Sequence, residues 1–262
     1  MPTRWPGSPV PADHALSSLA DLTWPEVRDR VGPATVLAVP LGATEQHGPH
    51  LPHSVDTDIA AALCAGLGVA RPDVVVAPAL PFGASGEHAG FPGTLSIGNE
   101  ALRHVLIELA RSATDTFSRV LFVSAHGGNG VGLRGAVTQL QTEGRHVSMF
   151  EPRWAGELHA GRTETSMMLA LAPDRVRMDL AEPGNPGPLP DILPLLRGRG
   201  IRVASPNGIL GDPRGATAEE GRALLTRLTG DLVAHVDHWL MSGRPAPSGV
   251  PVPDATGGKV GS

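Results

Sequence analysis

Residues 119–150 read RVLFVSAHGGNGVGLRGAVTQLQTEGRHVSMF. The stretch begins with an apolar, β-branched run at 119–124, continues with helical composition over 129–143 and ends with a second apolar run at 146–150. A short buried strand, a helix of this length and another buried strand form a βαβ unit, in which the two strands run parallel. The stretch therefore predicts an α/β domain with helices packed on a sheet.

The rest of the chain repeats this alternation. Further buried strands are expected at 34–39 and 74–77, and further helices are expected at 23–31, 56–70, 99–116, 164–171 and 218–240. Residues 79–97 and 182–200 are rich in Gly or Pro and are expected to be loops. We expect one α/β domain with a mostly parallel sheet over 34–241, after a lead-in with a short helix at 1–33 and before a Pro/Gly-rich mobile tail at 242–262.

The composition excludes several classes of protein. The chain contains 33 glycines and 26 prolines, but they follow no Gly-X-Y repeat. The chain is therefore a loop-rich globule and not a collagen. The net charge of −5 and the 9 aromatic residues argue against binding to nucleic acid. Cys64 stands alone, which excludes an internal disulfide and a cysteine cluster for metal. With no apolar run of membrane-spanning length and no signal-peptide pattern, we expect a cytoplasmic protein.

Metal-ligating residue types gather where the predicted strands end. Ligand sites of parallel sheets lie beyond the carboxyl ends of the strands. Glu45, His47 and Asp56 follow the first strand, His126 follows the third, and Glu164 opens a later helix. Mixed nitrogen and oxygen ligands suit Zn, Mn or Fe, and one carboxylate can bridge two ions. The sequence therefore predicts a metal centre, which would hold two ions if one carboxylate bridges them.

Two further patterns leave alternatives open. His47, His50, His53 and Asp56 recur every three residues with prolines between them, so that an extended polyproline-like segment would place them on one face; alternatively, His50 and His53 are only loop residues. Gly130, Gly132 and Gly135 fit the G-x-G-x-x-G pattern of dinucleotide-binding oxidoreductases. That pattern requires a tight turn directly after the strand, and here Gly130 lies six residues past Ser124, so we expect these glycines to pack the helix against the sheet.

Five segments, in order, resemble the signature segments of the creatininase (creatinine amidohydrolase) family over residues 34–240. They are Glu45-Gln-His47-Gly-Pro-His50, Val55-Asp56-Thr-Asp58, Phe91-Pro92-Gly93-Thr94, His126-Gly-Gly-Asn129 and His159-Ala-Gly-Arg-Thr-Glu164. The resemblance implies a three-layer α/β/α sandwich, two divalent metal ions per chain, hydrolysis of an amide bond, and a homo-oligomer such as a hexamer. Within the family the chain is most similar to the peptidases of mycofactocin biosynthesis, which trim a modified precursor peptide. A cyclic amide or a formamide is the alternative substrate.

The resemblance also implies roles for individual residues. Glu45 and His126 would hold one metal, His47 the other, and Asp56 would bridge them, while the ions activate a water molecule and polarise the scissile carbonyl. His159 would protonate the leaving nitrogen. In creatininase a metal-binding Glu lies two residues after the His that matches His126, whereas Gly128 occupies that position here.

We expect Glu164 to supply this missing ligand, with His50 or Asp58 as the next candidates. Further residues are expected to bind substrate or support the ligands: His50, Asp58, Glu87, His88, Gly127, Gly128 and Asn129.

Overall fold

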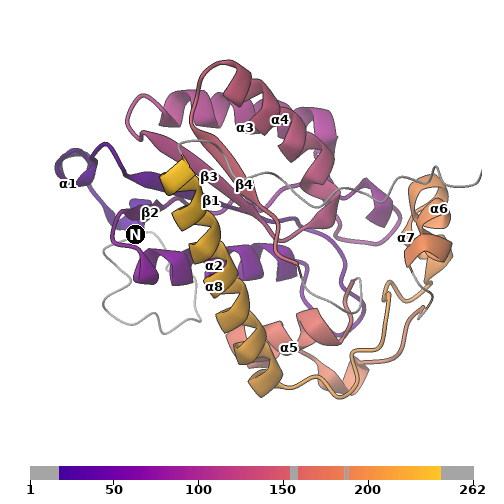
Figure 1. Ribbon diagram of the computed structural model, residues 1–262. Coiled ribbons are helices and arrows are strands. Elements are labelled where there is room, and N and C mark those ends of the chain that lie inside the picture. The colour runs from indigo at the N-terminus through magenta and orange to yellow at the C-terminus, as the bar shows by residue number, and fades with distance from the viewer. Residues whose placement is uncertain (1–17, 154–158, 186, 188, 243–262) are drawn as a thin grey trace, which may run out of the picture.

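The computed structural model describes residues 18–153, 159–185, 187 and 189–242. Within these residues, four strands form one parallel sheet in the order β2-β1-β3-β4 (Figure 1). The strands are β1 (Val36–Leu41), β2 (Val74–Val76), β3 (Arg119–Ser124) and β4 (Val147–Phe150). The central pair, β1 and β3, is in register from Val36 opposite Arg119 to Leu41 opposite Ser124. Both of these strands therefore end at the same edge of the sheet.

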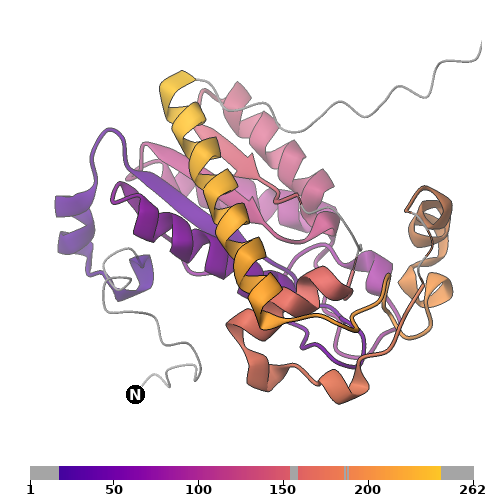
Figure 2. The ribbon, with the colours of Figure 1, turned by 60° about the horizontal axis from the view of Figure 1, so that its bottom comes forward.

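Helices cover both faces of the sheet, which confirms the expected three-layer α/β/α sandwich. The helices α2 (Val55–Ala70), α5 (Arg162–Leu171) and α8 (Ala218–Ser242) lie on one face, and α3 (Gly98–Ala113) and α4 (Gly130–Thr142) lie on the other (Figures 1 and 2). Alternate residues of β1 point to opposite faces, as the two-residue repeat of a strand requires. Val36 and Ala38 pack with α2, α5 and α8, whereas Leu37 and Val39 pack with α3 and α4.

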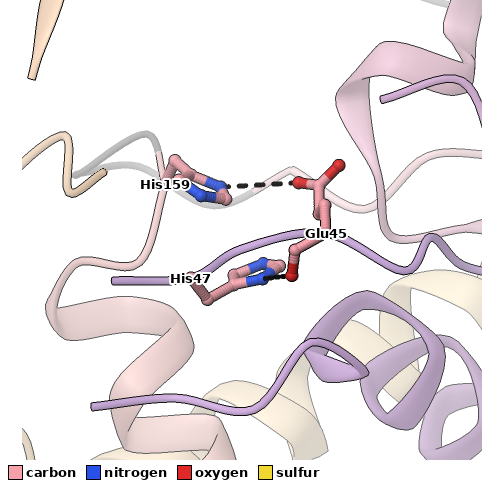
Figure 3. A group of neighbouring side chains, drawn as sticks. All are labelled: Glu45, His47 and His159. Atoms are coloured by element: carbon pink, nitrogen blue, oxygen red, sulfur yellow. Dashed lines mark hydrogen bonds and ion pairs between the residues drawn. The ribbon is translucent and has the colours of Figure 1, made fainter. Parts of the chain in front are cut away.

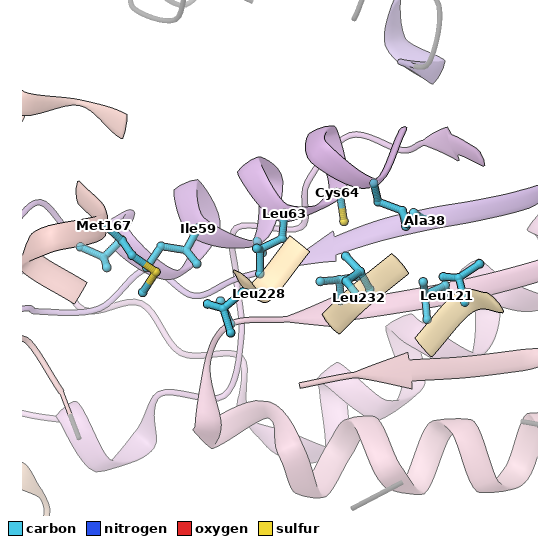
Figure 4. Close-up of a cluster of buried hydrophobic side chains, with 14 of the residues drawn as sticks. Ala38, Ile59, Leu63, Cys64, Leu121, Met167, Leu228 and Leu232 are labelled. Atoms are coloured by element: carbon cyan, nitrogen blue, oxygen red, sulfur yellow. The ribbon is translucent and has the colours of Figure 1, made fainter. Parts of the chain in front are cut away.

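The core on the α2 face holds the helices in place around the site. Ile59, Leu63 and Cys64 of α2 pack with Leu228 and Leu232 of α8 (Figure 4). Ala38 and Leu121 of the sheet and Met167 of α5 complete this cluster. Cys64 is fully buried, and burial raises the pKa of its thiol, so it acts as a small apolar side chain.

The remaining helices are short. Helix α1 (Trp24–Arg30) begins with the expected capping box, in which Glu26 accepts a hydrogen bond from the Thr23 amide at 2.6 Å. Single 3₁₀ turns are η2 (Leu19–Asp21), η3 (Gly86–His88), η4 (Gly127–Asn129), η5 (Pro173–Arg175) and η6 (Met178–Leu180). Residues 1–17 and most of the expected tail, 243–262, lie outside the described residues.

The prediction of a loop over 182–200 is wrong in part. Helix α6 (Leu189–Arg199), with Pro194 inside it, fills the second half of this segment, and helix α7 (Ile201–Ala204) follows it. Ile192 and Leu196 are four residues apart and lie on one side of α6, where they pack with Ile201 and Leu210. This apolar contact stabilises a helix that the proline content argued against.

Two glycines of the G-x-G-x-x-G pattern, Gly132 and Gly135, pack against a helix and not, as predicted, against the sheet, whereas a Cβ atom at position 130 would meet the side chains of Arg134 and Glu151. A Cβ atom at position 132 would lie 2.8 Å from the Asn99 carbonyl oxygen, and one at position 135 would lie 3.2 Å from the Arg103 side chain. Asn99 and Arg103 belong to α3, so Gly132 and Gly135 permit the close approach of α4 to α3.

Among the described residues, no helix combines the length and the apolar character that crossing a bilayer requires.

Candidate metal centre

Six candidate residues meet at the carboxyl ends of β1 and β3. Glu45 and His47 lie in the loop after β1, and His126 lies directly after β3. Asp56 lies in the first turn of α2, Glu164 lies in the first turn of α5, and His159 precedes α5. All six residues are at most 7% exposed, although charged residues are rarely buried unless they are paired.

The carboxylate of Asp56 lies between two histidines. Its Oδ1 is 3.4 Å from His47 Nε2, and its Oδ2 is 3.4 Å from His126 Nδ1. Glu164 Oε2 lies 3.8 Å from His47 Nε2, and Glu45 Oε2 lies 3.2 Å from His126 Nε2. Ligand atoms close enough to hold an ion occur in the groups Glu45–Asp56–His126 and His47–Asp56–Glu164, which share Asp56. A third group combines Glu45 and His47 with His159.

The orientation of the two histidine rings fits a cation. His47 Nδ1 donates to the Glu45 carbonyl oxygen at 3.1 Å (Figure 3), and His126 Nε2 donates to the Ala84 carbonyl oxygen at 3.0 Å. A neutral imidazole that donates through one nitrogen has a lone pair on the other, so the lone pairs of His47 and His126 face Asp56. Metal-ligating histidines show this arrangement, in which the distal N–H is held by a backbone carbonyl.

The contacts around Asp56 are otherwise unfavourable. A histidine lone pair and a carboxylate oxygen are both acceptors, and within the described residues neither His47 Nε2 nor Asp56 Oδ2 makes a hydrogen bond. Buried polar atoms without a partner cost free energy, which a cation between them would recover. The residues at this edge of the sheet therefore fit a metal centre.

The electrostatics of the group point the same way. Burial lowers the pKa of His47, but the carboxylates of Asp56 and Glu164 outweigh this effect and raise the pKa to about 10. Without a metal ion, the His47 ring therefore holds an extra proton, whose positive charge faces these carboxylates. Burial raises the pKa of Glu164 to about 7, although His47 opposes that shift. The pKa of Glu45 falls well below its usual value because His126 and His88 outweigh the effect of burial. Burial and the neighbouring His47 hold the pKa of His159 well below its usual value.

A cavity of about 670 Å³ opens onto the group. Glu45, Asp56, His126, His159 and Glu164 form its polar side. Leu196 of α6, Ile201 of α7 and Leu210 form an apolar wall, and Glu151 and Arg153 after β4 line it as well. This apolar wall was not predicted, because Leu196 lies in the segment expected to be a loop and Ile201 and Leu210 fall in no predicted element.

Several residues that we expected to bind substrate line this cavity, and others do not. Glu87, His88, Gly127 and Gly128 are among the lining residues, whereas His50, Asp58 and Asn129 are not. His50 is buried, with its Nε2 2.9 Å from Thr165 Oγ1. Asp58 forms an ion pair in which its Oδ2 lies 2.8 Å from Arg175 Nη1. The Asn129 side chain bridges two loops by accepting from the Ala84 amide and donating to the Gly42 carbonyl.

The expectation that His47, His50, His53 and Asp56 share one extended face is wrong. Gly48 has φ +67°, which turns the chain, and His47 pairs with Leu51 in an isolated antiparallel bridge. His53 lies instead against the Pro92 carbonyl oxygen, at 3.0 Å. Of the four residues, His47 and Asp56 belong to the candidate ligand groups.

Position 128 has no room for a side chain. A Cβ atom there would lie 2.3 Å from the Ala84 carbonyl oxygen, 2.4 Å from His126 Nε2 and 2.5 Å from Glu87 Oε1. The backbone oxygen cannot move aside, so position 128 cannot present a side-chain metal ligand in this chain.

The chain is similar to known proteins over most of its length. The sequence model of the creatininase family, described as creatinine amidohydrolase, matches residues 20–236. A protein of Mycobacterium ulcerans (strain Agy99) named mycofactocin precursor peptide peptidase is 44% identical over 247 residues, covering 90% of this chain and 92% of that protein. A solved structure of a mutant creatininase aligns with a TM-score of 0.74 at 25% identity, covering 86% of this chain and 98% of its own. Another, named creatininase Mn, has a TM-score of 0.72 with the same identity and coverage.

Proposed function

The chain belongs to the creatininase family and is a hydrolase of C–N amide bonds, and from this premise we propose that it is a peptidase that trims a modified precursor peptide in mycofactocin biosynthesis. The observation that carries the proposal is the 44% identity to a mycofactocin precursor peptide peptidase across nine-tenths of the chain. The cavity of about 670 Å³ supports it, because it has room for a peptide end and offers an apolar wall at Leu196, Ile201 and Leu210.

We propose that two divalent cations, drawn from Zn, Fe and Mn, act as cofactors. Glu45, Asp56 and His126 would hold one, and His47, Asp56 and Glu164 would hold the other, with Asp56 shared. The lone pairs that face Asp56 support this assignment, and nitrogen and oxygen donors suit all three metals. When bound, such a pair of ions lowers the pKa of a water molecule and polarises the scissile carbonyl.

His159 is the proposed proton carrier. It lines the cavity, and its Nδ1 lies 3.7 Å from Glu45 Oε1 (Figure 3). Because its pKa is held low, its ring is neutral near pH 7 and can accept a proton. It would take the proton from the attacking water and deliver it to the leaving nitrogen.

We also propose a homo-oligomer, such as a hexamer. Three large apolar side chains in the segment before α3 support it, since Phe82 is 46% exposed, Leu95 54% and Ile97 38%. Light scattering should then give a multiple of the chain mass of 27.1 kDa.

The test is metal analysis combined with a substrate panel followed by mass spectrometry. The panel holds peptides with modified C-terminal residues, creatinine as the cyclic amide, and an N-formyl compound. We expect two divalent ions per chain, loss of peptide cleavage when a chelator removes them, and recovery on adding them back. Full activity without metal would refute the metal assignment, and turnover of creatinine without cleavage of any peptide would refute the peptidase proposal.

No finding favours the dinucleotide-binding oxidoreductase that the three glycines suggested. Gly132 and Gly135 permit the close packing of α4 on α3, and the family assignment covers the whole segment. Adding a nicotinamide dinucleotide should therefore leave the activity unchanged.

A further inference from the structure

Gln46 lies between two candidate metal ligands in the sequence, and its side chain contacts three distant parts of the chain. It is 5% exposed. Its Nε2 lies 3.0 Å from the Gly208 carbonyl oxygen, 3.0 Å from His88 Nδ1 and 3.1 Å from His159 Nε2. Both histidines line the cavity, so one amide reaches two side chains of the site.

The orientation of this amide is fixed by its other end. Gln46 Oε1 accepts a hydrogen bond of 2.8 Å from the Gly48 backbone amide, which can only donate. The same oxygen fills the space beside Gly208, where a Cβ atom would lie 2.0 Å away and where φ is +81°. The nitrogen of Gln46 must therefore face the histidines.

Gln46 Nε2 carries two hydrogens but has three neighbours that could accept them. His159 Nε2 also lies 2.9 Å from the Gln46 backbone carbonyl oxygen, which can only accept. His159 Nε2 must therefore carry a hydrogen for that carbonyl and cannot accept another. The two hydrogens of Gln46 go to the Gly208 carbonyl and to His88 Nδ1.

This count assigns a tautomer to each histidine. With its Nδ1 accepting from Gln46, neutral His88 has its hydrogen on Nε2, which points at Glu45 Oε1 at 3.1 Å. With its Nε2 donating to a backbone carbonyl, neutral His159 has its lone pair on Nδ1. That nitrogen faces the same oxygen of Glu45 at 3.7 Å (Figure 3).

We propose that Gln46 is a positioning residue that selects these tautomers: it makes His88 a donor that holds Glu45 in place, and it leaves His159 Nδ1 unprotonated and directed at the site. The chemical consequence rests on the proposed function. A water proton moves to His159 Nδ1 as the water oxygen bonds to the scissile carbon. The C–N bond then breaks, the same proton moves to the leaving nitrogen, and His159 is neutral again.

The first test is ¹⁵N NMR of metal-free protein labelled in its histidines, near pH 7, with His88→Gln and His159→Gln used for assignment. We expect a protonated Nε2 and an unprotonated Nδ1 for both residues. A hydrogen on Nδ1 of either residue would overturn the proposal. The measurement needs neither metal nor substrate, so its outcome is independent of whether the peptidase proposal holds.

The second test is Gln46→Glu, which keeps the shape of the side chain and the acceptor for Gly48 but removes the hydrogens of Nε2. We expect His88 to move its hydrogen to Nδ1. We also expect kcat on the cleaved peptide to fall by about 10–100-fold, as for other residues that orient metal ligands, with KM and metal content unchanged. An unchanged His88 tautomer would overturn the proposal.

Gln141→Glu is the matched control. Gln141 also donates to a backbone carbonyl, that of Val147 at 2.9 Å, but it lies on α4 and does not line the cavity. It should leave both tautomers and kcat unchanged. An equal loss of kcat in the two variants would show a general cost of the Gln-to-Glu change and would overturn the positioning role. Should Gln46→Glu fail to fold, the wild-type tautomers decide the question.

Discussion

Among single residues, Asp56 has the greatest influence on the proposed site, because each of its carboxylate oxygens faces a different histidine. Asp56→Asn keeps the shape but removes the charge that both ions would share. We expect metal content to fall for both ions and activity to fall by several orders of magnitude, while circular dichroism stays near wild type. A loss of less than about tenfold, equal to ~1.4 kcal/mol of barrier, would contradict the bridging role.

Asp58→Asn is the control, because it makes the same change two residues further along α2. Asp58 pairs with Arg175 and does not line the cavity. We expect two ions per chain and near wild-type activity, with a loss of at most about 1 kcal/mol of folding free energy, as for a partly exposed ion pair. Equal losses of activity in the two variants would mean that the charge of the α2 N-terminus matters and not the bridge.

Glu164 has two roles that one substitution can separate. Its Oε2 accepts a hydrogen bond of 2.6 Å from the amide of Ala160, which has φ 54°, and the same oxygen lies 3.8 Å from His47 Nε2. Glu164→Gln keeps an oxygen for Ala160 and removes the charge. We expect anomalous diffraction to show loss of the ion beside His47 and retention of the ion beside His126. If both ions remain at wild-type occupancy, Glu164 only supports the turn at Ala160.

At the scale of whole elements, the contact of α8 with α5 fixes the position of Glu164. Gly221 of α8 packs directly on the backbone of α5, where a Cβ atom would lie 1.8 Å from the Ser166 carbonyl oxygen. Gly221→Ala should therefore push the two helices apart and lower the free energy of unfolding by about 1–3 kcal/mol, as overpacking does. Because α5 carries Glu164, metal affinity should fall with it.

Gly230→Ala in the same helix should have the opposite effect. A Cβ atom at position 230 meets nothing within 4 Å, so the change only removes the conformational freedom of an exposed helical glycine. We expect a gain of about 0.5–1 kcal/mol. Thermal or denaturant unfolding of the pair measures both signs, and a stabilised Gly221→Ala would show that α8 does not constrain α5.

The sequence predicted those helices and strands whose apolar side chains recur at a regular spacing. The apolar run of β3 and the helical period of α3 are local patterns, and the structure confirms both elements. Helix α6 was not predicted, because its stability comes from contacts of Ile192 and Leu196 with residues elsewhere in the chain. Pro194 also argued against a helix in this segment.

The same limit applies to the candidate site. Residue types at predicted strand ends suggested Glu45, His47, Asp56 and His126, because parallel strands end at one edge. Contacts between residues that are far apart in the sequence produce no local sequence pattern, so they could not be predicted. Gln46 meets Gly208 across 162 residues, and nothing near either residue indicates that contact.

At the scale of the molecule, metal binding should reverse the dependence of stability on pH. In metal-free protein the pKa of His47 is raised to about 10 and that of Glu164 to about 7. Both folded pKa values exceed the unfolded ones, so the folded state binds these protons more tightly than the unfolded state does. The stabilisation from His47 is complete below its unfolded-state pKa of 6.5 and is lost as pH rises through about 10. The contribution of Glu164 likewise falls as pH rises from its unfolded-state pKa of 4.5 through about 7.

Metal-loaded protein should behave in the opposite way, because metal ligands must lose their protons before an ion binds and binding to the folded state stabilises it. Between about pH 6 and about pH 9, the Tm of chelator-treated protein should therefore fall while the difference between loaded and metal-free protein widens. Differential scanning calorimetry with and without Mn²⁺ measures both curves, and metal-free His47→Gln should lose the part of the slope above about pH 7, since glutamine does not titrate. Parallel curves for loaded and metal-free protein would mean that the ions do not bind at the titrating carboxylate–histidine cluster, and would place them elsewhere on the chain.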